Sequence, residues 1–348
     1  MKSHESSGQS MAGDGQKGAG STMVHSPPVE VLLATYNGER FLREQIDSIL
    51  LQDYKNLRVL ARDDGSNDST TAILKEYEHR FPDRFRTMPP GAPTGNAKDN
   101  FLLLMKAATS DYVCFSDQDD IWLPGKVSRT MQAMSTLELQ HGTNSPLLVF
   151  TDLQVVDDSL KTLHESLWRL AGVDPDQIHR LATVLVHNPV TGCTMLINRR
   201  LLDIAVKMPG EAAMHDSWIA LLASAFGASE AVAAKTVLYR QHDRNVIGID
   251  AHKKSWREQI AGFFQREGRV LQWKANERKV EALLRIHKEE LSPKHRKLLE
   301  AYLRCGRSDS RIVRVATMLR YRFFRPGFSR NAATLVDLWR AKTGQPSL

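Results

Sequence analysis

The sequence predicts an α/β fold in which a Rossmann-like, mostly parallel sheet is flanked by helices and followed by a helical C-terminal extension. Short apolar runs recur at strand length, and most are followed by a turn and then by apolar residues at helical spacing. Repeated strand–turn–helix units of this kind give parallel strands with helices on both faces. Beyond His252 the pattern becomes nearly all helical. We therefore expect a disordered tail at 1–26, an α/β domain at 27–250 and a basic helical extension at 251–348.

The elements follow from the spacing of apolar residues. In the first half, Phe41, Leu42, Ile46, Ile49 and Leu50 share one helix face, and Asp68 or Ser69 can cap the next helix. Expected strands are 29–34, 57–61, one near Arg86, 112–116, 147–151, the end of 188–197, and 231–239. Expected helices are 39–51, 69–79, 100–108, 127–139 and 216–226, with breaks in the C-terminal part near Ser292-Pro293, Gly306 and Pro326-Gly327.

Composition limits where the protein works. Three widely spaced cysteines, Cys114, Cys193 and Cys305, form neither a disulfide framework nor a zinc spacing, which fits a reducing cytosol. The Gly/Ser/Lys-rich start lacks the apolar segment of a secretory signal, and Met11 or Met23 are alternative start positions. The apolar stretch 218–239 contains Glu230 and Lys235, so we interpret it as a helix followed by a strand. We expect a cytoplasmic protein.

Charge is distributed unevenly along the chain. The net charge is +7, yet residues 252–348 contain 23 Lys and Arg and 9 Asp and Glu, whereas the rest of the chain is slightly acidic. A strongly basic segment favours an anionic partner, either a membrane surface or nucleic acid.

The range 311–325 has the pattern of an amphipathic helix. Ile312, Val315, Leu319 and Phe323 fall near one face, with Arg311, Arg314, Arg322 and Arg325 mostly elsewhere. Two interpretations stay open. The helix lies on the anionic inner face of the cytoplasmic membrane, or it packs onto the domain and exposes a charged face.

The most informative motif is Asp117-Gln118-Asp119-Asp120, which directly follows the apolar run 112–115. Ligands of open α/β sheets bind at the carboxyl ends of the strands. Carboxylates clustered there repel one another unless a cation lies among them, and oxygen ligands suit Mg²⁺ or Mn²⁺, which usually hold phosphates. The motif predicts a metal–diphosphate site, with a solvated acidic turn as the plainer alternative.

Other polar motifs end neighbouring strands. Thr35-Tyr36-Asn37-Gly38-Glu39 follows the first strand and opens a helix, where backbone N–H groups favour an anionic ligand. Asp63 and Asp64 follow the second strand and can bond a nucleoside, or form only a turn and cap. The glycine-rich motifs of dehydrogenases and P-loop enzymes are absent from the sequence.

Two later motifs carry further candidates. Asp216, in Met214-His215-Asp216-Ser217-Trp218, is either a helix cap or a general base whose affinity for protons is raised in an apolar cleft. His242 follows the last predicted strand and gains a role only if the fold returns it to Asp119.

Together these motifs resemble the inverting glycosyltransferases of family 2, which adopt the GT-A fold, and most closely their rhamnosyltransferase-like branch. The resemblance covers roughly residues 29–250. Its hallmarks look like Thr35-Tyr36-Asn37-Gly38, Arg62-Asp63-Asp64-Gly65-Ser66, Asn96-Ala97-Lys98-Asp99-Asn100-Phe101, Asp117-Gln118-Asp119-Asp120-Ile121-Trp122, Met214-His215-Asp216 and Tyr239-Arg240-Gln241-His242.

The resemblance implies a role for each matching position. Nucleotide-sugar contacts fall on Thr35, Tyr36, Asn37, Glu39, Asp63, Asp64, Asn100 and Asp117. Ligands for Mg²⁺ or Mn²⁺ fall on Asp117, Asp119 and His242. Acceptor contacts fall on Gly192, His215 and Trp218, and Asp216 is the implied catalytic base. The implied donor is dTDP-rhamnose, and the implied acceptor is a saccharide or a lipid-linked sugar of bacterial surface polysaccharide.

Other functions remain open. A UDP-linked donor would use the same site, and a metal-dependent nucleotidyltransferase also uses paired acids beside a nucleotide. A nucleic-acid-binding module could use the basic tail, but aromatic residues are not interleaved with the basic ones in an RNA-binding pattern, so we expect no nucleic-acid partner.

Overall fold

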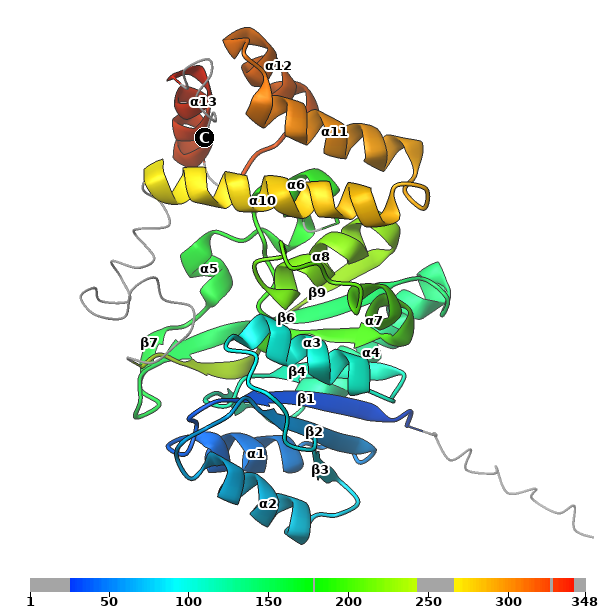
Figure 1. Ribbon diagram of the computed structural model, residues 1–348, viewed down its shortest axis with the longest axis vertical. Coiled ribbons are helices and arrows are strands. Elements are labelled where there is room, and N and C mark those ends of the chain that lie inside the picture. Colours follow the sequence, from blue (N-terminus) through cyan, green and yellow to red (C-terminus); the bar gives the residue numbers. More distant parts are fainter. Residues whose placement is uncertain (1–25, 178, 243–265, 326–327, 341–348) are drawn as a thin grey trace, which may run out of the picture.

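The computed structural model describes residues 26–177, 179–242, 266–325 and 328–340. One nine-stranded sheet runs through the lower part of the molecule, helices cover both of its faces, and four C-terminal helices stand above it (Figure 1). The expected disordered tail lies outside the described residues, apart from Ser26. The expected boundary between 250 and 251 falls within 243–265 and also lies outside them.

The first half of the sheet is parallel. β1 (Val29–Thr35) pairs with β2 (Leu57–Asp63) on one side and β4 (Tyr112–Ser116) on the other, and β3 (Phe85–Thr87) extends the sheet beyond β2. The register sets Thr35 opposite Asp63 and Leu33 opposite Ser116. The loops that follow these strands therefore meet at one edge of the sheet, as the apolar runs predict.

The second half of the sheet is mixed. β8 (Leu196–Asn198) runs antiparallel between β4 and β6 (Leu147–Val156), and β9 (Ala228–Arg240) runs parallel to β6. Two strands that the sequence did not indicate, β5 (Ile121–Trp122) and β7 (Thr162–His164), pair with β9 and β6. They are too short to show a period of two. The β5–β9 pair matters for the site, because it returns the end of β9 to the acidic loop.

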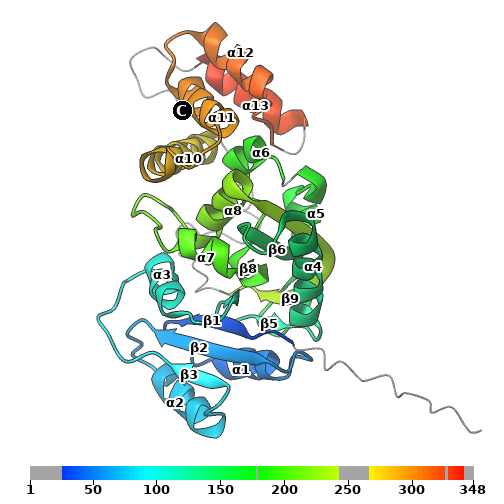
Figure 2. The same ribbon diagram turned by 90° about the vertical axis from the view of Figure 1, so that its right-hand side faces the viewer.

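Alternate side chains of the strands build two cores. Val31, Val59 and Cys114 face α1 (Leu42–Leu50), α2 (Thr70–Arg80) and α4 (Lys126–His141). Leu32, Leu60 and Phe115 face the other layer, in which α3 (Ala97–Ala107), α5 (Leu167–Ala171), α6 (Leu181–Val186), α7 (Arg199–Ala205) and α8 (His215–Phe226) lie (Figure 2). Burial on both faces explains why these strands read as continuous apolar runs.

The C-terminal extension is helical as predicted. It consists of α10 (Arg266–His287), α11 (Pro293–Arg307), α12 (Arg311–Tyr321) and α13 (Phe328–Arg340). Trp273, Val280 and Leu283 of α10 belong to the same core as α8, so the extension shares its interior with the α/β unit. Of the expected breaks, the one at Ser292-Pro293 starts α11, whereas Pro326-Gly327 lies outside the described residues.

The expected break near Gly306 is confirmed, because α11 ends at Arg307 and Gly306 lies in its last turn. A Cβ placed there would come 1.7 Å from Glu277 Oε1 and 2.6 Å from Trp273 Nε1. The glycine therefore permits α11 to approach α10 closely. Among the helices described, none is long and apolar enough to cross a bilayer.

Candidate active site

Two loops at the end of the parallel strands are joined by hydrogen bonds. Asn37, with a positive φ of 48°, donates its N–H to Ser66 Oγ at 2.8 Å and accepts at Oδ1 from the Asn67 N–H at 2.9 Å. Glu39 accepts from the Ser69 N–H at 3.0 Å. In this structure, both predicted donor-binding side chains thus hold the loop after β1 against the loop after β2. Their direct contact with a nucleotide stays a prediction.

Asp63 ties the ends of β1 and β2 together. Its Oδ1 accepts from Thr35 Oγ1 at 3.1 Å, and its Oδ2 accepts from the backbone N–H groups of Gly65 and Ser66 at 3.1 and 2.8 Å. Gly65 has a φ of +86°, which favours glycine and allows this tight turn. Thr35 and Asp63 therefore form the rigid base of the loop pair.

Asp64 is buried and holds a different loop. It accepts from Arg62 Nη1 at 2.7 Å, from the Thr94 N–H and hydroxyl at 2.7 and 2.9 Å, and from the Gly95 N–H at 2.9 Å. Burial alone would raise the pKa of Asp64, but these hydrogen bonds outweigh it and lower the pKa below the usual value. The carboxylate is ionised and fully engaged.

Asn100 supports the same ion pair from behind. Its Oδ1 accepts from Arg62 Nη1 at 2.9 Å, and its side chain is only 2% exposed. The structure therefore places Asn100 beneath the loop, and its contact with a donor stays a prediction. The sequence motif around Asn100 therefore marks a residue that supports the buried Arg62–Asp64 ion pair.

Tyr36 and Gln118 bridge the first loop to the acidic loop. The Tyr36 N–H donates to Gln118 Oε1 at 2.7 Å, and Gln118 Nε2 donates to the Tyr36 carbonyl at 2.8 Å. A Cβ on Gly38 would come 2.3 Å from Gln118 Oε1, so the glycine makes room for this bridge. The Tyr36 ring itself is exposed.

Two of the three predicted metal ligands, Asp119 and His242, are in direct contact, and the third, Asp117, is affected by the charge of Asp119. Asp119 Oδ2 lies 2.8 Å from His242 Nε2, so β9 does return the histidine to the acidic loop. Asp117 lies near enough to both Asp119 and Asp216 to be affected by their charges. Burial first, then the charges of Asp119 and Asp216, raise the pKa of Asp117 to about 7. A cation at this point would relieve that repulsion.

Oxygen and sulfur ligands compete at this centre. Ligand atoms of Asp117, Asp120 and Cys193 also lie within 4.8 Å of one another. Burial, together with the charges of Asp120 and Asp117, raises the pKa of the Cys193 thiol well above its usual value, so the sulfur stays protonated. A protonated soft ligand suits neither Mg²⁺ nor Mn²⁺. The predicted set of Asp117, Asp119 and His242 offers the oxygen and nitrogen atoms that suit those ions, and its binding of a metal stays a prediction.

Arg240 fixes the acidic loop, a role that sequence reasoning did not assign. Its N–H donates to Asp120 Oδ1 at 3.2 Å, its Nε donates to the Asp119 carbonyl at 2.9 Å, and its Nη2 donates to Glu44 at 2.6 Å. The guanidinium also stacks over Phe41, 4.3 Å from the ring centroid. Its place in the Tyr-Arg-Gln-His motif was the only available signal.

Asp216 stands in the first turn of α8, where Met214 is the cap residue. Burial raises the pKa of Asp216 to about 6, although the Ser217 N–H, the Lys279 cation and the Gly192 N–H each lower it. Near neutral pH the carboxylate is therefore ionised but basic enough to accept a proton. The simple helix-cap reading of this residue is not what the structure has.

Gly192 and His215 pack beside Asp216. A Cβ on Gly192 would come 2.8 Å from His215 Nε2 and 3.9 Å from Asp216 Cβ. The His215 ring lies 4.1 Å from that of Phe101 and 5.3 Å from that of Phe115, and burial lowers its pKa to about 3. His215 is thus a neutral, almost fully buried ring that forms part of the wall behind Asp216.

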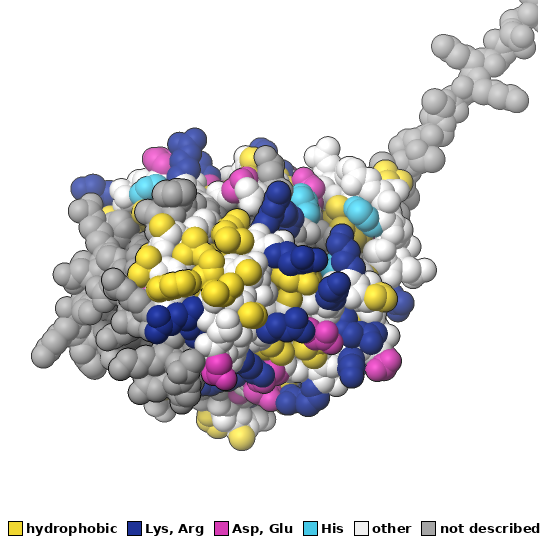
Figure 3. All heavy atoms as spheres, turned by 90° about the horizontal axis from the view of Figure 1, so that it is seen from above, with side chains coloured by type: hydrophobic (Ala, Val, Ile, Leu, Met, Phe, Trp, Pro, Cys, Tyr) yellow, Lys and Arg dark blue, Asp and Glu magenta, His cyan; other side chains and the backbone are white. Residues whose placement is uncertain are grey.

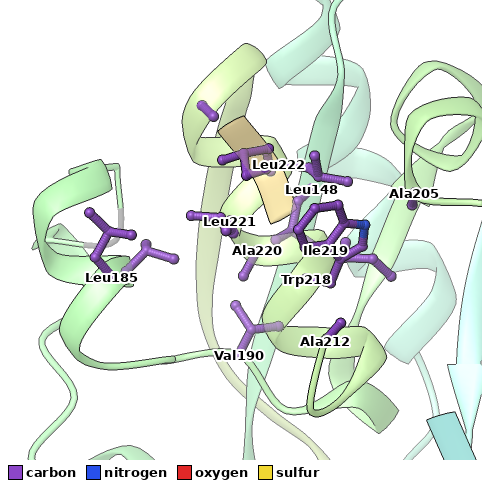
Figure 4. Close-up of a cluster of buried hydrophobic side chains, with 14 of the residues drawn as sticks. Leu148, Leu185, Val190, Ala205, Ala212, Trp218, Ile219, Ala220, Leu221 and Leu222 are labelled. Carbon is purple, nitrogen blue, oxygen red and sulfur yellow. The ribbon is translucent and has the colours of Figure 1, made fainter. Parts of the chain in front are cut away.

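Trp218 is a core residue, which corrects its expected contact with an acceptor. It is fully buried, and Figure 4 shows its indole among Leu148, Ile219 and Ala212. Successive helical residues are rotated by about 100°, so a residue two positions after Asp216 points to roughly the opposite side of α8. The side that carries Trp218 faces the core.

The extension contributes a residue that sequence reasoning missed. Lys279 of α10 is 3% exposed, and burial lowers its pKa to about 8 while the charge of Asp216 raises it. A buried cation thus acts on the candidate base from the C-terminal extension. No motif marks Lys279, because one lysine in a basic segment carries no local signal.

Comparison with known proteins is consistent with this geometry. The profile of the family described as Glycosyl transferase family 2 matches residues 30–141. The dTDP-rhamnosyl transferase RfbG of Shigella flexneri is 28% identical over 234 residues, which cover 64% of this chain and 76% of that protein. Two uncharacterized glycosyltransferases of Rickettsia match over about half of their own length.

Two solved structures share the fold at low identity. Residues 1–349 of TarS from S. aureus, in complex with UDP-GlcNAc, align with a TM-score of 0.52 and 13% identity, covering 90% of this chain and 89% of that one. The mannosyltransferase PcManGT from Pyrobaculum calidifontis, in complex with GDP-Man and Mn²⁺, gives 0.50 and 17%, covering 90% and 80%.

The fold is a mixed α/β fold similar to that of GT-A glycosyltransferases, which confirms the predicted fold class. Residues 30–141 match the domain of family 2 glycosyltransferases, and the chain is similar to glycosyltransferases beyond that range, in agreement with the resemblance of its motifs.

Proposed function

We propose that this protein is a metal-dependent, inverting glycosyltransferase that moves L-rhamnose from dTDP-rhamnose to a saccharide or lipid-linked acceptor during assembly of a bacterial surface polysaccharide such as O-antigen or capsule. The printed name of the Shigella relative supports the donor. The neighbours that carry UDP-GlcNAc and GDP-Man support nucleotide-sugar use in general. A UDP-linked sugar is the alternative donor.

The observation that carries this proposal is the position of Asp117. Its charge is coupled on one side to Asp119, which pairs with His242, and on the other side to Asp216. A donor-side acid pair and an acceptor-side base therefore belong to one centre. A nucleotidyltransferase would use the paired acids but has no need of a base on the acceptor side.

Asp117, Asp119 and His242 would hold Mg²⁺ or Mn²⁺. The ion, when bound, supplies positive charge that stabilises the departing diphosphate. Arg240 contributes by fixing the backbone of the acidic loop. In the same way, the paired loops around Asn37, Glu39 and Asp63 contribute a rigid donor pocket, and the exposed Tyr36 ring is the group we assign to stack on the base.

Asp216 acts as the base in a single displacement. The acceptor oxygen forms a bond to the anomeric carbon as the bond from that carbon to the diphosphate oxygen breaks, which inverts the anomeric centre. The hydroxyl proton moves to the Asp216 carboxylate. A base whose pKa is about 6 is ionised at neutral pH and still has useful proton affinity, since general-base efficiency is greatest near the working pH.

A product assay tests the proposal directly. The protein is incubated with dTDP-rhamnose, UDP-linked sugars or GDP-mannose, each with Mn²⁺ or with chelator, and a panel of acceptor glycosides. Release of nucleoside diphosphate that needs metal, with an inverted linkage by NMR, supports the proposal. Release of pyrophosphate would mean nucleotidyl transfer. Full activity in the presence of chelator would show that the reaction needs no metal ion.

We place the reaction in the cytoplasm, at the inner face of the cytoplasmic membrane, where a lipid-linked acceptor is accessible. The basic C-terminal extension supports this location. Fractionation of cells that express the protein checks it, because release of the protein from membranes by high salt is expected of a peripheral protein.

A further inference from the structure

Helix α12 exposes large apolar side chains and buries one of its arginines. Ile312 and Leu319 are 72% and 50% exposed, whereas Arg314 between them is buried. Phe323, which the helical pattern sets on the same face as Ile312, is buried instead, because the helix ends at Arg322 with a φ of 55°. A helix that merely closes the domain would bury its apolar stripe. That reading therefore does not account for α12.

Helix α13 extends the exposed apolar surface. Val336 and Trp339 are 45% and 50% exposed, and a groove of about 410 Å³ is lined by Val315 of α12 and by Leu335, Val336 and Trp339 of α13. Figure 3 looks down on these helices and shows yellow side chains gathered into one patch. We define the apical patch as the exposed side chains of Ile312, Leu319, Val336 and Trp339 together with the half-buried side chains of Val315 and Leu335.

Positive charge borders the apical patch. Arg311, Arg320 and Arg322 are exposed, and dark blue side chains adjoin the yellow ones in Figure 3. The sequence of α12 contains no acidic residue, and Asp337 of α13 is buried. An apolar surface with a cationic margin and a partly exposed Trp is the arrangement that suits the interface of an anionic bilayer.

We propose that the apical patch is a membrane-contact surface, which inserts its apolar side chains among the acyl chains of an anionic bilayer while the surrounding arginines bind lipid phosphates. A second copy of the chain is a poor occupant, because it would present the same cationic margin and be repelled. The purpose that we give to this contact, delivery of a lipid-linked acceptor, rests on the proposed function. The contact itself does not.

Vesicle sedimentation tests the contact. Full-length protein is mixed with vesicles of phosphatidylcholine alone or with one quarter phosphatidylglycerol. Wild type is expected to pellet with the anionic vesicles only. Ile312→Glu with Leu319→Glu should weaken binding at least tenfold, because two inserted side chains are replaced by charges. Replacement of Arg311, Arg320 and Arg322 by Gln should cost about fivefold per residue, from ~1 kcal/mol per charge.

A matched control comes from exposed leucines elsewhere. Leu51 and Leu139 are 80% and 88% exposed, and their change to Glu should leave vesicle binding as in wild type. Unchanged melting temperatures and unchanged sugar transfer to a soluble acceptor separate loss of the contact from misfolding and from failure of the proposed function. If the soluble-acceptor reaction fails in wild type while vesicle binding persists, only the proposed function falls.

Three outcomes would overturn the proposal. One is equal binding by wild type and the Ile312→Glu, Leu319→Glu protein. Another is concentration-dependent self-association that this double variant abolishes, measured by light scattering without vesicles, because the patch would then bind a second copy. The third is binding that appears only after deletion of 341–348, because that segment would then occupy the patch in the native chain.

Discussion

The two sides of the candidate active site differ in how their buried polar groups are satisfied. On the donor side, Arg62, Asp63, Asp64 and Asn100 all bond to neighbouring loops. On the predicted acceptor side, both ring nitrogens of His215 lack hydrogen-bond partners among the described residues. Buried polar groups are normally satisfied, and exceptions concentrate where function needs them. The predicted donor side is held by many hydrogen bonds, whereas the predicted acceptor side has a neutral, unpaired histidine ring beside Asp216.

The sharpest test of this difference is Asp216→Asn. The substitution keeps the shape of the side chain but removes its proton affinity, so turnover should fall by about 10²- to 10⁴-fold, the usual contribution of a general base. Donor affinity, measured by calorimetry, should stay within a factor of two or so because the donor side is left intact. Asp203→Asn, an exposed acid on α7, is the control that should change neither quantity. Near-normal turnover of Asp216→Asn would refute the base assignment.

The opposite side is tested by Arg62→Met. Loss of one partner from a buried ion pair should lower the free energy of unfolding by about 3 kcal/mol, because Asp64 and Asn100 lose their shared donor. Donor affinity should fall with it, since the loop around Thr94 depends on Asp64. Chemical denaturation measures the first effect. Arg58→Met, exposed on the same strand, should change stability by less than about 0.5 kcal/mol. Equal effects of the two substitutions would contradict a rigid donor side.

Binding of a metal ion to Asp117 and Asp119 should stabilise the folded protein. With Mn²⁺ at 100 times its dissociation constant, the folded state should gain about 2.7 kcal/mol. A thermal-shift series with and without chelator measures this gain, and the double change of Asp117 and Asp119 to Asn should abolish it. Cys193→Ser should preserve it, because the thiol is protonated. Loss of stabilisation in Cys193→Ser instead would move the metal to Asp117, Asp120 and Cys193.

The smallest expected effect concerns Lys279→Met. The Lys279 cation lowers the pKa of Asp216, so its removal should raise that pKa above about 6. Asp216 must be ionised to act, and activity is therefore lost as pH falls through this pKa. The acidic limb of the profile of kcat/KM against pH should shift to higher pH, by less than about one unit. Arg278 is exposed on the same helix, so Arg278→Met should leave the acidic limb unchanged. An unshifted acidic limb in Lys279→Met would show that Lys279 does not affect the pKa of Asp216.

Local sequence patterns predicted the parallel half of the sheet well. β1, β2 and β4 are apolar runs, and the polar motifs of the candidate site lie in the loops directly after them. The second half was harder, because β5 and β7 are two and three residues long and α5 to α7 are short. Elements of this length exist only because long-range pairing and packing hold them.

Residue roles show the same limit. The motif around Asp216 indicated a base, but it could not tell that Trp218 faces the core while Asp216 faces the site. Likewise, Asn100 and Arg240 lie in recognisable motifs, yet their contacts with Arg62 and with the acidic loop are made across the fold. The sequence places a helix end near Gly306, as the structure has it, but only the neighbours on α10 show that the glycine also permits a close helix contact.

The sequence by itself determined which acids end which strands, because apolar runs and turn residues are local signals. It also determined that the C-terminal part is basic and helical. Only the tertiary structure decided that His242 meets Asp119, that the charges of Asp119 and Asp216 both reach Asp117, that Lys279 lies close enough to affect Asp216, and that Ile312 and Leu319 of α12 face outward. Each of these depends on contacts between segments far apart in the chain, which periodicity cannot encode.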